Sequence, residues 1–447
     1  MKNRIVKKYD NGLVLVYKRN TSRNAVFFDI RFKSGLNNDP EDKLGLAHVA
    51  EHCLCFSNNK YTLKEKTEKL SKLFYANFAT SRTSLRLYAY VSDEEFEDTF
   101  EYFSNCLSDV VIPEEEFTNE KQVVNQEILR FRKNLAAEMD FTHHENLFEE
   151  KVPIRVRAFG TTDTVAKIES HDVKDYLLKC LTLSNCQITV YGNVSLLRVK
   201  KAIKKYLLSS LNATSDKQFL GPNEVIKYSA NKPAMIVNKS PDDGKSKIEI
   251  YHKVSFDNLD RLRGYATSIL SSIFETAAKE FFRDKYGLCY ASRLRFKHVL
   301  SLDNKYDIAT MTITIECDQD VVKKVLEVLP EFYSFLNNYK INDSSIEEAK
   351  TILRRYEKCV IGKDYVKKGE SLSNSQFYND IYYTYWQNLR YKRQREKITT
   401  EFIKNIFKSA IKEQPFIFVV SNTEEELPTY KKIIKDINRN LKWLNDV

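Results

Sequence analysis

Strand-like and helix-like segments follow one another in the same order in both halves of this 447-residue chain. In each half, one strand-like segment comes early, a second leads directly into an amphipathic helical stretch, and a third lies near the end. The segments are residues 24–35, 84–91 and 186–194 in the first half, and residues 246–256, 307–317 and 416–423 in the second. Matched intervals of this kind indicate two copies of one structural plan.

We therefore predict an α+β fold with two similar α/β-sandwich domains, each an antiparallel-rich sheet packed with helices. The expected domains are residues 1–215 and residues 225–447, with a polar stretch between them. Helices are predicted at residues 113–133, 171–181, 259–282 and 321–336. A hydrophobic content of 42% is enough for a core in each domain. No apolar run approaches the roughly 18 residues of a membrane span.

Residues 45–56, GLAHVAEHCLCF, carry two histidines four positions apart. If this segment is helical, His48 and His52 lie one turn apart on one face, and Glu51 flanks that face. Two imidazoles in this arrangement can bind one Zn²⁺, with the carboxylate beside the ion rather than on it. Zinc acidifies a water molecule and a glutamate accepts its proton in many hydrolases. The alternative is a helix that carries two histidines by chance.

A catalytic zinc site needs a third protein ligand and one open position. The segment after Pro113 starts with three glutamates, which favours the start of a helix. This helix would carry Glu120 and Glu127, and seven residues make about two turns, so both carboxylates return to one face. One of them is expected to bind zinc and the other to orient a ligand.

A net charge of +10 raises the alternative of a nucleic-acid-binding protein. The densest basic stretch, residues 390–397 (RYKRQREK), lacks the signature of a nucleic-acid-binding module. A solvated helix face is the simpler interpretation of such a run. We therefore expect no nucleic-acid partner.

The N-terminal segment has an apolar stretch that is too short and too interrupted for a signal peptide. The eight cysteines are scattered and form no C-x-x-C pair. Reduced, mostly buried thiols are the expectation for such a chain. These features together predict a cytoplasmic protein.

The run from His48 to His52 resembles the inverted zinc motif of the pitrilysin/insulinase family of metallopeptidases, the inverzincins. This resemblance implies that His48 and His52 bind Zn²⁺ and that Glu51 is the general base. The family has a third zinc ligand, a glutamate well after the motif, with another glutamate seven positions before it. The matching residues are Glu127 as the ligand and Glu120 as a second catalytic group beside the site.

Two further segments carry the same resemblance. Residues 75–91 are similar to the family's Asn-Ala-x-Thr-Ser segment, whose edge strand pairs with substrate, and this implies substrate contacts at Asn77 and Ala79. The order of residues there departs slightly from the family's order. Residues 281–296 resemble the Arg-x-x-x-Gly-Leu-x-Tyr segment, in which Arg283 and Tyr290 match a pair that binds substrate. An arginine can donate to a substrate carbonyl, and a tyrosine hydroxyl can help to stabilise an oxyanion.

The resemblance implies a zinc metalloendopeptidase that cleaves short or unfolded peptides inside an enclosed chamber. The family also contains non-catalytic partner subunits, which form the alternative. Two α+β domains correspond to one half of the family's clamshell, as in the branch of the mitochondrial processing peptidase. A homodimer, in which one copy supplies zinc and its partner supplies Arg283 and Tyr290, is therefore expected, with a heterodimer of related subunits as the alternative.

Overall fold

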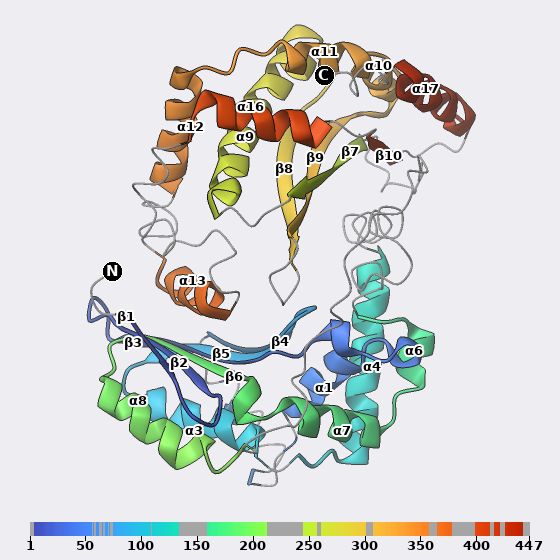
Figure 1. The fold of residues 1–447 in the computed structure, drawn as a ribbon. Helices are drawn as coiled ribbons and strands as arrows, with labels where there is room; N and C mark the ends of the chain where they lie inside the picture. The colour runs from blue at the N-terminus through green and yellow to red at the C-terminus, as the bar shows by residue number, and fades with distance from the viewer. Residues whose placement is uncertain are drawn as a thin grey trace. The chain divides into compact units, whose positions relative to one another are not determined.

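The computed structural model of the chain describes residues 4–55, 57, 60–61, 65, 68–69, 71, 75–108, 110–133, 159–211, 245–256, 261–300, 307–356, 364–377, 398–411, 415–420 and 425–440. Residue contacts divide the chain into two compact units, whose elements are labelled in Figure 1. The first unit comprises Met1–Phe141, Lys151–Glu224 and Ile361–Arg390, and the second comprises Thr142–Glu150, Val225–Val360 and Tyr391–Val447.

The sheet of the first unit has six strands in the order β1-β2-β6-β3-β5-β4. The strands are β1 (Arg4–Lys8), β2 (Val14–Arg19), β3 (Ala25–Phe32), β4 (Tyr75–Thr80), β5 (Leu85–Ser92) and β6 (Cys186–Gly192). Strands β2 and β6 are parallel, and the other neighbouring pairs are antiparallel. Among the described residues, β4 pairs only with β5 and forms an edge of the sheet.

Helices α3, α7 and α8 lie on one side of this sheet, and α1 packs against α4 and α7 (Figure 1). The helices are α1 (Leu46–Leu54), α3 (Phe96–Cys106), α4 (Glu114–Lys133), α6 (Thr162–Ala166), α7 (Ser170–Cys180) and α8 (Leu196–Ala202). Short 3-10 turns are η1 (Leu36–Asn38), η2 (Glu41–Lys43) and η4 (Leu183–Asn185), and α8 continues into a π-helical turn, η5 (Ile203–Leu207).

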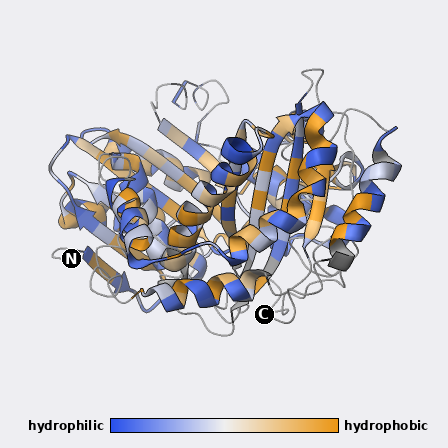
Figure 2. Ribbon diagram, turned by 90° about the horizontal axis from the view of Figure 1, so that it is seen from above, coloured by the Kyte–Doolittle hydropathy of each residue, from blue (hydrophilic) through white to orange (hydrophobic). Residues whose placement is uncertain are grey.

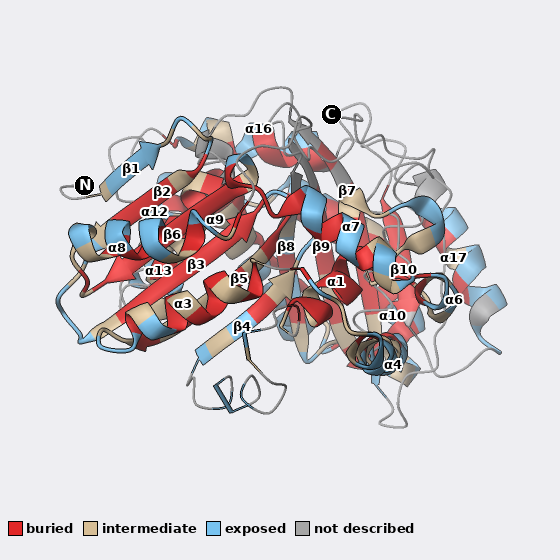
Figure 3. Ribbon diagram, turned by 90° about the horizontal axis from the view of Figure 1, so that it is seen from below, coloured by how far each residue is buried: buried red, intermediate tan, exposed pale blue. Residues whose placement is uncertain are grey.

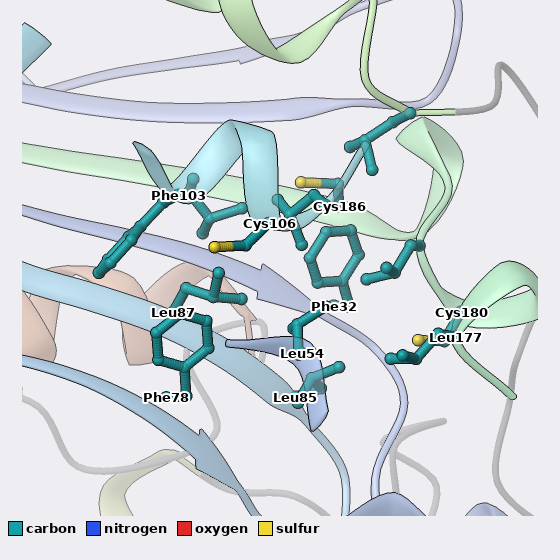
Figure 4. Close-up of a cluster of buried hydrophobic side chains, with 14 of the residues drawn as sticks. Phe32, Leu54, Phe78, Leu85, Leu87, Phe103, Cys106, Leu177, Cys180 and Cys186 are labelled. Carbon is teal, nitrogen blue, oxygen red and sulfur yellow. The ribbon is translucent and has the colours of Figure 1, made fainter. Parts of the chain in front are cut away.

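The core of the first unit follows from the alternation of side chains along its strands. On β5, Leu85, Leu87, Ala89 and Val91 are buried, and the residues between them are partly exposed. Successive residues of a strand point to opposite faces, so the four apolar side chains share the face that the helices cover. Strands β3 and β6 are buried over most of their length (Figure 3). Figure 4 shows this core, to which the strands, α1, α3 and α7 all contribute.

The opposite face of the same sheet is covered by α13 (Tyr365–Phe377), which comes from the second half of the sequence (Figure 1). Tyr365 and Leu372 of α13 form a buried apolar cluster with Val16, Phe27 and Tyr191 of the sheet, and buried polar groups lie beside it. The Oδ2 atom of Asp29 on β3 accepts hydrogen bonds from Ser373 Oγ at 2.6 Å and from Arg31 Nη2 at 2.9 Å. Arg31 Nη1 donates to Asn374 Oδ1 at 2.7 Å. Asp29 and Arg31 are both buried.

The position of α13 differs from the domain division expected from the sequence, which assigned all of residues 225–447 to the second domain. Residues 361–390 belong to the first compact unit. Gly369 lies against the ring of Phe27, where an added Cβ would come within 2.2 Å of the ring. This close approach and the polar contacts at Asp29 join segments more than 300 residues apart. Local sequence patterns carry no signal for such a contact.

The sheet of the second unit has four described strands in the order β10-β7-β9-β8, all antiparallel. The strands are β7 (Lys245–Phe256), β8 (Ala291–Leu300), β9 (Asp307–Asp318) and β10 (Phe416–Val420). The order β10-β7-β9-β8 in this sheet matches the order β6-β3-β5-β4 in the first sheet. Strands β7, β8, β9 and β10 thus correspond, one by one along the chain, to β3, β4, β5 and β6. The predicted α+β fold with a repeated, antiparallel-rich plan is thus confirmed.

The helices of the second unit include α9, which packs on β8, and α16, which packs on β7 and α9. They are α9 (Arg261–Lys279), α10 (Val322–Glu327), α11 (Leu329–Asn337), α12 (Asp343–Tyr356), α16 (Thr400–Ile411) and α17 (Leu427–Asn440), with a π-helical turn η6 (Glu280–Lys285) and a 3-10 turn η7 (Gln319–Val321). Helices in Figure 2 carry both apolar and polar residues.

The single helix predicted at 321–336 is two helices in the structure. Helix α11 has a proline, Pro330, in its first turn. Proline has no backbone N–H and is tolerated at the first positions of a helix but not in its interior. The chain therefore ends α10 at Glu327 and starts α11 at Leu329.

No helix in the described ranges is long and apolar enough to cross a membrane. The basic run at 390–397 lies outside the described residues.

Replacing Asp29 by alanine is expected to destabilise the protein by about 3–5 kcal/mol, because the buried Arg31 cation would lose its partner. Burial by itself raises the pKa of Asp29, but Arg31, Arg86 and the Ser373 hydroxyl hold this pKa below its usual value. Asp29 is therefore charged in the folded protein at neutral pH. Urea unfolding of Asp29→Ala measures the loss.

The matched control is Asp42→Ala, which removes an exposed aspartate from η2. Exposed positions of this kind change the free energy of unfolding by about 0.5 kcal/mol or less. Equal stability of the two variants would show that the polar contact under α13 contributes nothing to the fold.

Candidate metal centre

Helix α1 starts at a glycine that no other residue can replace without strain. Gly45 has φ +96°, and an added Cβ would come within 2.7 Å of the Phe159 carbonyl oxygen. The carboxylate of Asp39 accepts hydrogen bonds from the backbone N–H groups of Gly45 at 2.8 Å and of Ala47 at 2.9 Å. These bonds satisfy free donors at the helix N-terminus. The first turn, which contains His48, is thereby fixed in direction.

Helix α4 supplies the carboxylates and lies beside α1 (Figure 1). Its first turn contains three glutamates and its last turn is basic, as the helix dipole favours. Phe117, Val124 and Ile128 are its buried residues and pack into the core of the first unit. Glu120 and Glu127 lie two turns apart and both reach α1.

Three potential metal ligands converge between these helices. Glu127 Oε2 lies 3.3 Å from His48 Nε2 and 3.7 Å from His52 Nε2. The ligand atoms of the three residues all lie within 4.8 Å of one another. Within the described ranges, no other group of three histidine, cysteine or carboxylate side chains meets the same criterion. Two imidazole nitrogens and one carboxylate oxygen form a donor set that suits Zn²⁺.

His52 is oriented by a carboxylate on its other side. Its Nδ1 atom lies 2.8 Å from Glu120 Oε2. Burial by itself lowers the pKa of His52, but the hydrogen bond to Glu120 and the nearby charges of Glu51 and Glu127 outweigh burial and raise this pKa. A carboxylate behind a ligating histidine fixes which nitrogen faces the metal and makes that nitrogen a better donor.

His48 is kept neutral by its surroundings. Burial and the neighbouring His52 lower the pKa of His48 to about 3. A neutral imidazole is the form that binds a metal ion. The donor set, the neutral His48 and the carboxylate behind His52 therefore fit a divalent metal ion.

Glu51 lies outside the group of three ligands but shares its surroundings. Burial raises the pKa of Glu51 to about 7, and the charges of Glu127 and Glu120 add to this effect while His52 opposes it. A carboxyl group with a pKa near neutrality can accept a proton from water at physiological pH. A cation bound beside it would lower this pKa.

Asn77 and Ala79 lie on the edge strand β4, next to the candidate centre. Thr80 Oγ1, near the end of that strand, donates to the Ala47 carbonyl oxygen of α1 at 3.4 Å. The side chain of Asn77 is exposed and lies 3.5 Å from the Tyr88 hydroxyl, and Ala79 is partly buried. An edge strand has backbone groups that can pair with an extended peptide.

Arg283 and Tyr290 lie in the second unit, and both side chains are exposed. The backbone carbonyl of Arg283 accepts a hydrogen bond from the N–H of Gly287, which has φ +63°. The Tyr290 hydroxyl donates to Asp318 Oδ1 at 2.5 Å, and this bond raises the pKa of Tyr290. The structure thus brings five predicted residues together in the first unit, namely His48, Glu51, His52, Glu120 and Glu127. Arg283 and Tyr290 belong to the second unit.

Three residues near the predicted groups were not found from the sequence. Asp39 had a weak signal, because aspartate is a common capping residue, but it lies six positions before Gly45 rather than at the cap itself. Phe159 contacts His48, and Asp318 contacts Tyr290. Each contact joins segments that are distant in the sequence. No local pattern marks either residue.

Two family descriptions match most of the chain. Residues 14–154 match "Insulinase (Peptidase family M16)", and residues 167–353 match "Peptidase M16 inactive domain". The first match contains the three candidate ligands and both neighbouring glutamates. The second contains Arg283 and Tyr290.

Similar proteins with curated descriptions include several peptidases. The chain is 26% identical over 205 residues to "Zinc protease PqqE" of Helicobacter pylori, a match that covers 45% of this chain and 46% of that protein. It is 21% identical over 232 residues to a probable mitochondrial-processing peptidase subunit beta of Arabidopsis thaliana, covering 52% of this chain and 44% of the other. The matches therefore span less than half the length of these relatives.

A similar solved structure is that of the periplasmic protease PqqL of Escherichia coli. The two structures align with a TM-score of 0.82 at 15% sequence identity, and the alignment covers 99% of this chain and 50% of that one. At this identity the likeness concerns the fold alone.

Binding of a divalent metal ion is expected to weaken as the pH falls through the raised pKa of His52, which lies above the usual 6.5. Protonated His52 cannot bind a metal, whereas His48 stays neutral because its pKa is about 3. In Glu120→Gln, the main group that stabilises protonated His52 is lost, so this weakening should move to lower pH. At higher pH the variant should bind zinc roughly 10- to 100-fold more weakly.

Competition with a chromophoric chelator between about pH 5 and pH 8, where histidine titrates, measures both effects. Glu115→Gln, on the exposed first turn of α4, is the matched control. If Glu120→Gln and the wild type gave the same pH curve, the contact between Glu120 and His52 would have no part in metal binding.

Proposed function

Because this chain belongs to the M16 peptidase family, we propose that it is a zinc-dependent endopeptidase. The observation that carries the proposal is the convergence of His48, His52 and Glu127, with Glu51 beside them. The proposed substrates are short or unfolded peptides. Cytoplasmic location is part of the proposal and rests on the sequence features alone.

His48, His52 and Glu127 would hold the zinc ion. When bound, zinc supplies Lewis acidity, which makes water a better acid and polarises a peptide carbonyl. Glu51 would accept the proton of the attacking water molecule and pass it to the leaving amine. Glu120 would act through His52, since its carboxylate holds the imidazole in the orientation that ligation needs.

The substrate would lie along the edge strand β4. Backbone groups near Asn77 and Ala79 would pair with an extended peptide, as edge strands do in other peptide-binding proteins. Thr80 and Ala47 connect this strand to α1, so a peptide paired with β4 would pass close to the helix that carries the histidines. Arg283 and Tyr290 are proposed to bind the substrate from the second unit of a chain.

A non-catalytic peptide-binding subunit is the second candidate. The match of residues 167–353 to an inactive domain favours it. The presence of both histidines, Glu51 and Glu127 in the first unit argues for catalysis instead. Cleavage assays on the purified protein discriminate the two candidates.

Glu51→Gln is expected to lower peptide cleavage by roughly 10²-fold or more while zinc content stays unchanged, because the change removes the proton acceptor but no ligand. Zinc content is measured by elemental analysis, and cleavage with a fluorogenic peptide library. Glu41→Gln, at an exposed position of η2, is the control and should cleave normally. Normal turnover by Glu51→Gln would mean that another group activates water.

Replacing His48 and His52 together by alanine is expected to abolish stoichiometric zinc binding, because two of three ligands are lost. His171→Ala removes a histidine whose side chain is 65% exposed and should retain zinc. Stoichiometric zinc in the double variant would place the metal elsewhere.

We also propose that two copies of the chain form the active assembly, as expected for the branch of the mitochondrial processing peptidase. The zinc centre of one copy would then be completed by Arg283 and Tyr290 of its partner. A heterodimer with a related subunit is the alternative. Symmetric pairs are the commonest assemblies of soluble chains.

Complementation tests this arrangement. A Glu51→Gln protomer is mixed with an Arg283→Ala, Tyr290→Phe protomer, each inactive alone. In a mixed dimer with shared sites, one site contains both defects and the other contains none, so activity should partly return. Absence of recovery, with subunit exchange demonstrated independently, would favour sites completed within one chain or a different partner.

A further inference from the structure

The two histidines of the candidate centre are held by different kinds of contact. His52 Nδ1 faces a carboxylate oxygen of Glu120 at 2.8 Å. His48 Nδ1 is buried, but no atom of the described residues forms a hydrogen bond with it. The usual means of orienting a ligating imidazole, an acceptor for its second nitrogen, is therefore absent from His48 within the described part of the chain.

Aromatic contacts surround the His48 ring instead. The centroid of the Phe159 ring lies 4.6 Å from the His48 centroid, with an angle of 56° between the ring planes. The His52 ring lies 4.8 Å away and nearly perpendicular to His48, at 85°. Such distances and tilted orientations are those at which aromatic rings attract one another.

Phe159 itself packs against neighbouring residues. Its ring stacks on Phe131 at 4.8 Å with 23° between the planes. Its carbonyl oxygen lies against Gly45, and the next residue, Gly160, has φ +75° and lies against the Leu44 carbonyl. Thr164 Oγ1 donates to that same Leu44 carbonyl oxygen at 2.8 Å. The backbone at Phe159 and Gly160 is thus packed against the start of α1.

The aromatic pair also connects the two helices that carry the ligands. Phe131 lies on α4 one turn after Glu127, and Phe159 touches His48 on α1. Contacts through Phe159 therefore act on the rotation of the His48 ring and on the spacing between His48 and Glu127.

We propose that Phe159 is a positioning residue for His48: it holds the imidazole by ring packing where Glu120 holds His52 by a hydrogen bond. The inference rests on the proposed metal site, but it concerns only how one of its ligands is oriented. Without the Phe159 ring, the His48 imidazole would be less restrained, since no described residue forms a hydrogen bond with its Nδ1 atom. The ligand would then have to be ordered when the metal binds, and metal affinity falls.

The test is zinc affinity of Phe159→Ala, measured by chelator competition on the full chain without reference to activity. Loss of a group that orients a ligand is expected to weaken zinc binding roughly tenfold. The visible absorption spectrum of the Co²⁺-substituted protein should shift as well, because ligand geometry changes. Phe159→Tyr, which keeps the ring, should restore both. If Phe159→Ala does not fold, Phe159→Leu is measured in its place, with the same direction expected.

Val123→Ala is the matched control, because Val123 is an apolar residue of α4 that is 44% exposed. Its zinc affinity should equal that of the wild type. Unchanged affinity and an unchanged Co²⁺ spectrum in Phe159→Ala would overturn the inference while leaving the metal site intact. Zinc binding that survives His48→Ala, His52→Ala would instead overturn the site itself, and the inference with it.

Discussion

The packing of α1 against α4 is the interaction on which the candidate centre depends. The histidines and the carboxylates lie on different helices, and a metal site exists only if those helices are held at a fixed spacing and rotation. Buried apolar residues of α4, such as Val124 and Ile128, anchor it in the same core that receives α1. Asp39 and Gly45 fix the end of α1 that precedes His48. Errors of about an ångström in such a frame are enough to weaken ligation or catalysis.

Much of this arrangement could be predicted from local patterns. The four-residue spacing of His48 and His52 and the seven-residue spacing of Glu120 and Glu127 are properties of single helices, and the structure has helices at both places. Runs rich in strand-forming residues likewise predicted β3, β5 and β6 with their counterparts in the second unit. The catalytic and ligand roles of these residues remain predictions that the proposed experiments address.

Other features depended on contacts between distant segments. The position of α13 is set by Ser373 and Gly369 meeting Asp29 and Phe27, which no window of neighbouring residues contains. The same holds for Phe159 beside His48. By contrast, the break between α10 and α11 had a local cause in Pro330, and a prediction that weighed proline more heavily than apolar periodicity would have found it.

The origin of α13 has a consequence for the order in which the protein can be completed during synthesis. Domains commonly fold as the ribosome releases them, beginning with the N-terminal one. Here the first sheet cannot receive its last covering helix until residue 377 has left the ribosome, long after strand β6 has been made. Until then, the partners that the described residues offer to the carboxylate of Asp29 and the guanidinium of Arg31 are each other and Arg86. A nascent chain that stops near residue 220 would therefore contain a sheet with one finished face and one face still open to solvent, on which apolar residues such as Phe27 lie beside the Asp29–Arg31 pair.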